Sequence, residues 1–200
     1  MEKYAAILLA GGNSSRMGKD KASLIINGVS LLEHSIRIVS PLVSRIIVML
    51  SPKRSLPPVS EDLMERIVVG IDSQPNQGPL QGISDAIPFL PEEVDSVFVL
   101  SCDLPFLSTD WLIELKQAQN QETDIVCSRW DGLANPLLAL YRKEVLSQAP
   151  LLLSAGKRSC FELFKNQSII QRTPSASSSR VCKDVNLPEE YEKARFLLED

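Results

Sequence analysis

The sequence predicts a three-layer α/β fold, in which a mostly parallel central sheet is covered by helices on both faces. Apolar, β-branched runs alternate along the chain with segments of helical periodicity, and this alternation is typical of strand–helix–strand units. Hydrophobic residues make up 44% and charged residues 23% of the chain, as is usual for folded globular proteins. A length of 200 residues without an internal repeat predicts a single domain over residues 1–200.

The expected strands are short apolar runs, rich in β-branched residues, that read as buried on both faces. They are Tyr4–Ala10, Arg45–Leu50, Ile67–Ile71, Ser96–Ser101 and Asp124–Ser128. Asp131-Gly132 is a turn signal, and it leads into a further strand at Pro136–Tyr141, which we expect near an edge of the sheet. Asn27-Gly28 is a second turn signal.

The first expected helix begins with Ser30-Leu31-Leu32-Glu33, which has the form of a capping box, where Ser and Glu satisfy the first amides of a helix. Its apolar spacing continues to Val39, before Pro41. The same reasoning predicts helices at 80–89, 109–119, 143–148 and 188–198, the last begun by Asn186 and an early proline. The serine-rich segment 174–180 is expected to be a loop.

Composition argues against several classes of function. A formal net charge of −4 provides no overall field for nucleic acid or an anionic membrane, so neither partner is expected. The apolar run near the amino terminus is too short for a signal peptide or a membrane span, which predicts a cytoplasmic protein. The sequence has no CxxC pair that would indicate a zinc site. The single histidine, His34, is expected to pack in the core or to lie on the surface.

The loop after the first strand carries the strongest chemical signal. Paired glycines let backbone amides approach phosphate oxygens, and Arg16 and Lys21 can neutralise a triphosphate. In an open α/β sheet, ligands bind outside the carboxyl ends of strands, where this loop lies. Its spacing fits neither a Walker A loop nor a GxGxxG fingerprint. We therefore predict a phosphate-binding loop of another type, with a glycine-rich turn bearing solvated charges as the alternative.

Two aspartates follow other predicted strands. Asp103 comes directly after Ser96–Ser101, and Mg²⁺ is normally held by one or two carboxylates together with substrate phosphates. The alternative for Asp103 is a helix cap before Thr109. Asp72 follows the strand expected at Ile67–Ile71, where it could contact a ligand, although an aspartate at a strand end is often only a turn former.

These segments together resemble the molybdenum cofactor guanylyltransferases. Leu9-Ala10-Gly11-Gly12, followed by Arg16-Met17-Gly18 and Asp20-Lys21, is similar to their LAGGxxxRMGxDK signature. The later blocks, which resemble the family in the same order over nearly the whole chain, are Asp72, Gly78–Gly82, Cys102–Leu107 and Asn186–Glu190. The resemblance implies a Rossmann-like nucleotidyltransferase fold and a cytoplasmic enzyme that uses Mg²⁺ to transfer GMP from GTP to the terminal phosphate of molybdopterin. It also implies transient contact with other molybdenum cofactor proteins.

The resemblance also implies roles for individual residues. The nucleotide-binding residues would be Leu9, Ala10, Gly11, Gly12, Lys21, Asp72 and Asp103. The catalytic residues would be Arg16, Lys21 and Asp103, with Asp103 also the metal ligand. The acceptor-binding residues would be Asn135, Lys157, Arg158 and Asn186. The chain departs from the family at Ser51, where many relatives have an asparagine that touches the nucleotide, and at Asn135-Pro136, where a His-Pro pair is common.

Two alternative functions stay open on the sequence alone. A cytidylyltransferase, or another nucleotidyltransferase with a different small phosphorylated acceptor, would usually show LAAG where this chain has Leu9-Ala10-Gly11-Gly12. A non-catalytic nucleotide-binding or partner-binding protein could keep the fold, but the presence of Arg16, Lys21 and Asp103 argues against it. Base preference separates the first alternative from guanylyl transfer, and turnover with GTP separates the second.

Overall fold

The structure is a computed structural model that describes residues 4–11, 20–74, 77–176 and 178–199. The strands in these ranges are β1 Tyr4–Leu9, β2 Ile25–Ile26, β3 Val29–Ser30, β4 Arg45–Leu50, β5 Ile67–Ile71, β6 Ser96–Ser101, β7 Ile125–Trp130, β8 Leu133–Arg142 and β9 Ile169–Arg172. The α-helices are α1 Leu31–Val39, α2 Glu61–Met64, α3 Pro79–Ala86, α4 Thr109–Ala118, α5 Lys143–Leu146, α6 Ala149–Ser154 and α7 Pro188–Glu199. Short 3₁₀ turns are η1 Lys21–Ser23, η2 Ser40–Leu42, η3 Ile87–Phe89, η4 Cys160–Phe164 and η5 Ser179–Cys182.

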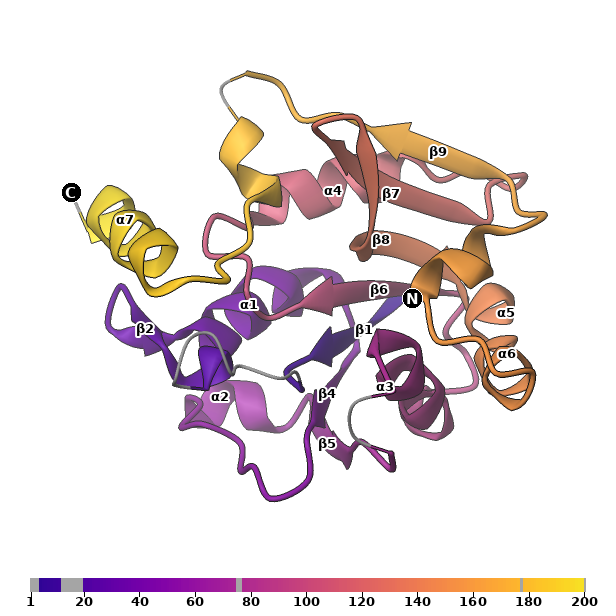
Figure 1. The fold of residues 1–200 in the computed structure, drawn as a ribbon, viewed down its shortest axis with the longest axis horizontal. Coiled ribbons are helices and arrows are strands. Elements are labelled where there is room, and N and C mark those ends of the chain that lie inside the picture. Colours follow the sequence, from indigo (N-terminus) through magenta and orange to yellow (C-terminus); the bar gives the residue numbers. More distant parts are fainter. Residues whose placement is uncertain (1–3, 12–19, 75–76, 177, 200) are drawn as a thin grey trace.

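Within the described ranges, seven strands form one sheet in the order β5-β4-β1-β6-β8-β7-β9 (Figure 1). The first four strands of this order run parallel to one another. β8 is antiparallel to both of its neighbours, and β9 is parallel to β7. Because β5, β4, β1 and β6 share one direction, their carboxyl ends meet at one end of the sheet, where open α/β sheets bind ligands.

Both faces of the sheet are covered, which confirms the predicted three-layer α/β class. Successive side chains of a strand point to opposite faces. On one face, Ala6 and Leu8 of β1 belong to the core that includes α1 and α4. On the other, Ala5 and Ile7 belong to the core that includes α3, α5 and α6. A strand buried on both faces requires an uninterrupted apolar run, as the sequence of β1 shows.

The two predicted turns both close hairpins. Asn27 and Gly28 connect β2 with β3, and Asp131 and Gly132 connect β7 with β8. In each pair the first residue has φ of 49° and the glycine has φ of 77°. Two consecutive residues with positive φ are the signature of a type I′ turn, for which Asn-Gly and Asp-Gly are the preferred pairs.

The strand expected near a sheet edge is internal, so that part of the prediction is wrong. β8 lies between β6 and β7, and β9, which was not predicted, occupies the edge. An internal strand normally excludes proline, because proline has no N–H for the ladder. The ladder between β7 and β8 accommodates Pro136 by a shift of register: Cys127 pairs with Ala139, whereas Ser128 pairs with Asn135. Pro136 thus lies in a bulge rather than in a regular ladder.

The helix starts agree with the sequence only in part. Ser30 Oγ accepts a hydrogen bond from the Glu33 N–H at 3.0 Å, as the capping box requires. The Glu33 carboxylate, however, accepts hydrogen bonds from Arg37 and Ser60, so the second half of the box is not formed. The Asn186 side chain, expected to begin α7, contacts Lys21 and Asp184 instead. The Glu190 carboxylate accepts from the N–H groups of residues 186 and 187.

The remaining helix predictions differ from the structure at their ends. The helix expected at 80–89 ends at Ala86 and continues as the 3₁₀ turn η3. The helix expected at 143–148 ends at Leu146 and is followed by α6, whose first turn contains Pro150. Proline is favoured there because the first amides of a helix have no intrahelical partner. The serine-rich loop ends where η5 begins at Ser179.

Three further observations concern features that the composition singled out: membrane spans, the cysteines and the single histidine. The described helices all lack the length and apolar character that a membrane crossing needs. The four cysteines are free and buried, and burial raises the pKa of Cys127 and Cys182 to about 11. His34 lies on α1, where burial lowers its pKa against the opposing effect of the backbone at Pro105 and Leu107. His34 therefore packs against the segment that follows Asp103, as a neutral ring at pH 7.

Candidate functional site

A cavity of about 760 Å³ lies at the carboxyl ends of the four parallel strands. Its size falls in the range of ligand-binding pockets. The residues that line it are Leu9, Ala10, Gly11, Asp20, Lys21, Met49, Ser51, Pro52, Lys53, Arg54, Asp72, Gly78, Pro79, Gly82, Ser101, Cys102, Asp103 and Leu137. Most of them are the last residues of β1, β4 and β6 or the first residues of the loops that follow β1, β4, β5 and β6. The fold thus gathers at one end of the sheet the residues that the sequence places after separate strands.

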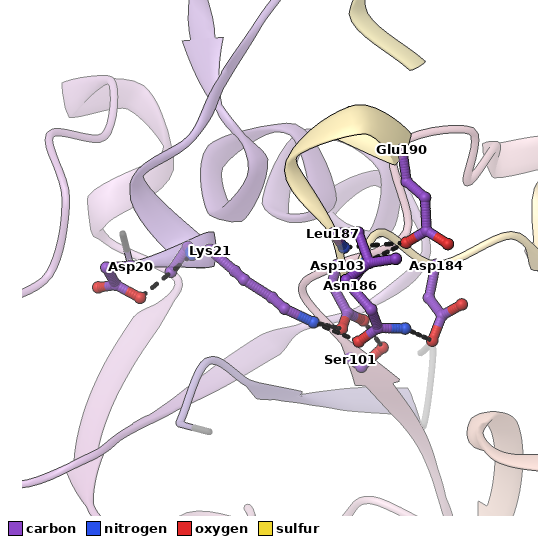
Figure 2. Close-up of polar contacts among 9 residues, drawn as sticks. Asp20, Lys21, Ser101, Asp103, Asp184, Asn186, Leu187 and Glu190 are labelled. Atoms are coloured by element: carbon purple, nitrogen blue, oxygen red, sulfur yellow. Dashed lines mark hydrogen bonds and ion pairs between the residues drawn. The ribbon is translucent and has the colours of Figure 1, made fainter. Parts of the chain in front are cut away.

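Lys21 extends from η1 into a polar network built from distant parts of the chain (Figure 2). Its Nζ lies 3.0 Å from Asp103 Oδ2 and donates to Asn186 Oδ1 at 2.6 Å. Ser101 Oγ donates to the other carboxylate oxygen of Asp103 at 2.5 Å, and Asn186 Nδ2 donates to Asp184 Oδ2 at 2.8 Å. The side chains of Lys21 and Asp103 are each 18% exposed, so the pair is partly shielded yet open to a ligand.

Contacts with the surrounding chain hold this network in place on two sides. The Val185 N–H donates to the Asp103 carbonyl at 3.0 Å, which ties the segment before α7 to the turn after β6. On the opposite side, the Asp20 carboxylate accepts from the Ala22 N–H at 3.3 Å and so begins η1. The same carboxylate forms an ion pair with Arg54, on the loop after β4. Both ends of the network are therefore held by contacts outside it.

Gly11 lies where two loops approach each other closely. A Cβ atom at this position would lie 3.0 Å from Ser51 Oγ and 3.2 Å from the Ser51 backbone nitrogen. The second of these contacts involves the backbone, which cannot move away as a flexible side chain could. Glycine therefore favours direct packing of the loop after β1 against the loop after β4, where both line the cavity.

Asp72 stands at the other end of the cavity. It follows β5, whereas Asp103 follows β6, and the order of the sheet places two strands between them. Three interstrand spacings correspond to roughly 14 Å. Burial raises the pKa of the Asp72 carboxyl, and the nearby charge of Asp85 raises it further, against a hydrogen bond from the Gln74 N–H at 3.0 Å. The two aspartates can thus contact opposite ends of one extended ligand.

The turn that carries Asp72 is fixed by α3. Ser73 donates to the Asp85 carboxylate through its N–H at 2.8 Å and through its hydroxyl at 3.0 Å. The buried Gln81 amide donates to the same carboxylate at 3.0 Å and to the Ser73 hydroxyl at 3.1 Å. The position of the residue next to Asp72 is therefore set by two side chains of one helix.

The structure brings most of the predicted nucleotide-binding residues into one cavity. Those that line it are Leu9, Ala10, Gly11, Lys21, Asp72 and Asp103. Gly12 and Arg16 lie outside the described residues. The contact of each with a ligand stays a prediction, but their convergence from three separate segments agrees with it.

The predicted acceptor-binding residues are more dispersed. Asn186 belongs to the Lys21 network, whereas Asn135, Lys157 and Arg158 are not among the lining residues. Asn135 Oδ1 accepts from the Leu137 N–H within the bulge of β8. The carbonyl oxygen of Arg158 lies 3.1 Å from the point where a Cβ of Gly78 would stand, so this residue adjoins the rim of the cavity. Their role in acceptor binding stays a prediction.

Sequence reasoning missed three side chains of the network and its supports: Ser101, Asp184 and Arg54. Ser101 and Asp184 each stand two positions before a predicted site residue. Arg54 lies in the turn after β4, at the end of the sheet where the predicted site lies. Inspection of the last residue of every parallel strand, together with the loop that follows it, would have found Ser101 and Arg54.

The oxygen donors at this end of the cavity suit a hard cation. Asp103 offers a carboxylate, and Asp184 and Asn186 stand next in the same network. Among the described residues, no group of three or more His, Cys, Asp and Glu side chains forms a metal cluster. Mg²⁺ commonly takes one or two protein carboxylates and completes its shell with phosphate oxygens and water. The donor set therefore fits a magnesium ion that the substrate helps to hold.

The sequence of this chain is similar to a known family and to named proteins. The profile of the family described as MobA-like NTP transferase domain matches residues 6–172. A Bacillus cereus protein named "Probable molybdenum cofactor guanylyltransferase" is 31% identical over 197 residues, which cover 98% of this chain and 97% of that protein. A Bacillus anthracis protein of the same name is 29% identical over 197 residues, with the same coverage.

Solved structures confirm the nucleotidyltransferase fold. Molybdopterin-guanine dinucleotide biosynthesis protein A from Archaeoglobus fulgidus has a TM-score of 0.75 at 19% identity, over 98% of each chain. The 4-diphosphocytidyl-2C-methyl-D-erythritol synthase from Anaerococcus prevotii has a TM-score of 0.70 at 14% identity, over 98% of this chain and 96% of that one. Because these two proteins carry names of different activities on one fold, the fold alone does not select the base or the acceptor.

Proposed function

The chain belongs to the MobA-like NTP transferase family, and from this premise we propose that it is a molybdenum cofactor guanylyltransferase. The proposed reaction transfers GMP from GTP to the terminal phosphate of molybdopterin and releases pyrophosphate. The names of the Bacillus relatives support this assignment over nearly the whole chain. We place the reaction in the cytoplasm, with transient contact to other molybdenum cofactor proteins.

The arrangement of charges in the cavity is the observation that carries the proposal. Lys21 and Asp103 lie at the β6 end, and Asp72 lies at the β5 end. A nucleoside triphosphate extended between them would place its base against Asp72 and its phosphates against Lys21. The ionised Asp72 carboxylate can accept both donors on the Watson–Crick edge of guanine. The corresponding edges of adenine and cytosine each present an acceptor, which the carboxylate would repel.

The chemistry of the acceptor explains why no general base is needed. A phosphate monoester has a second pKa of about 6, so it is mostly a dianion at pH 7. One of its oxygens attacks the α-phosphorus of GTP, and a new P–O–P linkage forms. The bond between the α-phosphorus and the bridging oxygen breaks, and pyrophosphate leaves with that electron pair. Rate enhancement then depends on alignment and on neutralisation of negative charge by Lys21 and Arg16.

Asp103 is the residue that would hold Mg²⁺ in this proposal. When bound, the ion would neutralise charge on the polyphosphate and on the leaving pyrophosphate. Lys21, whose ammonium group lies at the same carboxylate, is positioned to contact phosphate oxygens beside it. Ser101 would keep the Asp103 carboxylate in one orientation through its hydrogen bond to Oδ1.

The decisive experiment measures pyrophosphate release by the purified protein with molybdopterin, Mg²⁺ and each of GTP, CTP and ATP. We expect turnover with GTP and little with CTP or ATP. Turnover that prefers CTP would instead make the protein a cytidylyltransferase. Nucleotide binding without turnover on molybdopterin would indicate another small phosphorylated acceptor or a binding protein. A panel of phosphorylated acceptors would then separate these two.

A further inference from the structure

The loop after β4 presents a lysine to the cavity in an unfavourable backbone conformation. Residues 51–54 form a tight turn, closed by the Arg54 N–H, which donates to the Ser51 carbonyl at 3.1 Å. Lys53 occupies this turn with φ of 67°. Glycine adopts such a left-handed backbone conformation without a steric penalty, whereas a residue with a Cβ atom adopts it at a cost. A turn optimised only for stability would therefore have glycine or asparagine at position 53.

Two contacts hold this turn against the ends of the predicted phosphate loop. Arg54 forms its ion pair with Asp20, which begins η1. Ser51 packs against Gly11, at the point where the chain leaves β1. Residues 11 and 20 flank the segment that the sequence identifies as the phosphate-binding loop. The first and last residues of the turn that contains Lys53 are thus held against Gly11 and Asp20.

The surroundings of Lys53 leave its charge available to a ligand. Lys53 lines the cavity and is exposed. Within the part of the chain that the structure describes, no carboxylate forms an ion pair with it. Its loop follows β4, and β4 lies between β5, which precedes Asp72, and β1, which leads into the phosphate loop. An anion that bridges these two regions would pass in front of Lys53.

We propose that Lys53 binds a phosphate group of the nucleotide and that this contact is the reason for a lysine at a position where glycine would relieve backbone strain. The inference rests on the proposed function, because it takes the occupant of the cavity to be a nucleoside triphosphate. It adds a cation from the loop after β4 to the one that Lys21 provides in the same cavity. The competing explanation is that Lys53 is an ordinary solvated turn residue, for which glycine would be equivalent or better in every respect.

Three variants separate these explanations. Lys53→Gly removes the charge and the strain together, Lys53→Arg keeps both, and Lys193→Gln removes an exposed charge on α7, away from the cavity. Titration calorimetry of each with GTP and with guanosine, at fixed Mg²⁺ and two salt concentrations, gives affinities and their salt dependence. Thermal unfolding shows whether the fold is intact.

We expect Lys53→Gly to unfold at the same or a higher temperature while it binds GTP about fivefold more weakly, as suits one exposed ionic contact. Its guanosine affinity should not change, and its GTP affinity should depend less on salt than that of the wild type. Lys53→Arg and Lys193→Gln should bind GTP like the wild type. Unchanged GTP affinity in Lys53→Gly, or an equal loss for guanosine, would overturn the proposal.

The same titrations distinguish failure of this proposal from failure of the proposed function. If the wild type and Lys53→Gly bind GTP equally well, only the proposed role of Lys53 is refuted. A wild type that prefers CTP refutes guanylyl transfer, and the Lys53 variants are then compared with CTP and cytidine. A wild type that binds no nucleoside triphosphate overturns both.

Discussion

The two halves of the sheet differ in strand direction and in what they give to the cavity. β5, β4, β1 and β6 are parallel, and the cavity lies at their carboxyl ends. β8 is antiparallel to both of its neighbours, and within the described chain this second half, β8-β7-β9, contributes only Leu137 to the lining. Parallel strands deliver their following loops to one place, whereas antiparallel strands alternate theirs between two ends. The parallel half therefore builds the ligand site, and the antiparallel half mainly extends the core.

The chain returns to the parallel half only after β9. The segment before α7 brings Asn186 to Lys21 and Val185 to the Asp103 carbonyl. We expect residues of the parallel half to determine how the nucleotide binds. Residues after β8 are expected to bind the acceptor or to complete the site. Substitutions in the two regions should then change different kinetic parameters.

The largest effect is expected from Asp103→Asn. The substitution keeps the size of the side chain but removes the charge that pairs with Lys21 and would hold Mg²⁺. Metal-dependent turnover should be abolished while circular dichroism shows an intact fold. Glu122→Gln, an exposed change in the turn before β7, is the control for loss of one negative charge. Wild-type activity of Asp103→Asn across a magnesium titration would show that the metal is held elsewhere.

Lys21→Ala should have the next largest effect. Loss of one preorganised electrostatic contact to the transition state costs roughly 2.7–4 kcal/mol, which slows turnover by about 10²–10³-fold. Arg16→Ala, in the same loop, should act to a similar extent. Single-turnover kinetics at saturating GTP isolates the chemical step from binding. A slowing of less than about fivefold would remove either residue from the catalytic set.

Asp72→Ala should change base recognition rather than catalysis. Charge-assisted hydrogen bonds contribute roughly 1.5–3 kcal/mol each, so GTP affinity should fall by about one to a few powers of ten. ATP affinity should change much less, because adenine does not offer the same donors. Calorimetric titration with GTP, ATP and CTP measures both effects. Equal losses for all three nucleotides would mean that Asp72 supports the loop or the metal instead.

The raised pKa of Asp72 adds a pH test of the same role. Burial and the charge of Asp85 shift the pKa upward, and only the ionised carboxylate can accept both guanine hydrogen bonds. GTP affinity should therefore decline as pH falls, beginning at a higher pH than an unshifted aspartate would give. Asp72→Asn should bind GTP weakly and lose this pH dependence. A wild type whose affinity is constant down to the usual pKa of aspartate would contradict the assignment.

The smallest effect is expected in the second region, from Lys157→Ala. Lys157 is exposed and lies 3.9 Å from the Glu162 carboxylate. If it contacts the acceptor, the KM for molybdopterin should rise about fivefold while GTP affinity stays constant. Lys165→Ala is a matched control, because Lys165 pairs with the same carboxylate at 2.9 Å. An equal response in both variants would indicate an indirect effect through Glu162.

The sequence predicts the parallel half more accurately than the other. The ranges expected for β4, β5 and β6 match the structure at both ends. β4 and β6 are apolar runs buried on two faces, for which there is no close alternative. The expectation that β5 is also buried is wrong, because β5 is an edge strand whose Val69 and Ile71 are exposed. β9 was missed because it is short, partly exposed and ends in Gln171 and Arg172, so it lacks an apolar pattern. The internal position of β8 depends on a bulge, which no local pattern of residues reveals.

The residues of the site also differ in how far the sequence predicts them. The convergence of Lys21, Asp72 and Asp103 on one cavity could be predicted because each belongs to a segment with its own chemical pattern. Two contacts could not be predicted. The ion pair of Asp20 with Arg54 depends on how two loops pack. The contact of Asn186 with Asp184 involves a side chain that was expected to cap a helix. The unfavourable φ of Lys53 is likewise a property of a turn whose shape its neighbours determine.

The contact between Lys21 and Asn186 also has a consequence for biosynthesis. The two residues are 165 positions apart, and at about 5–20 residues per second a ribosome needs on the order of ten seconds or more to add the second after the first. The last strand of the sheet ends at Arg172, so every strand is already made before Asn186 is added. The described strands of the sheet therefore leave the ribosome before Asn186 does, and Lys21 gains this partner only after they have emerged.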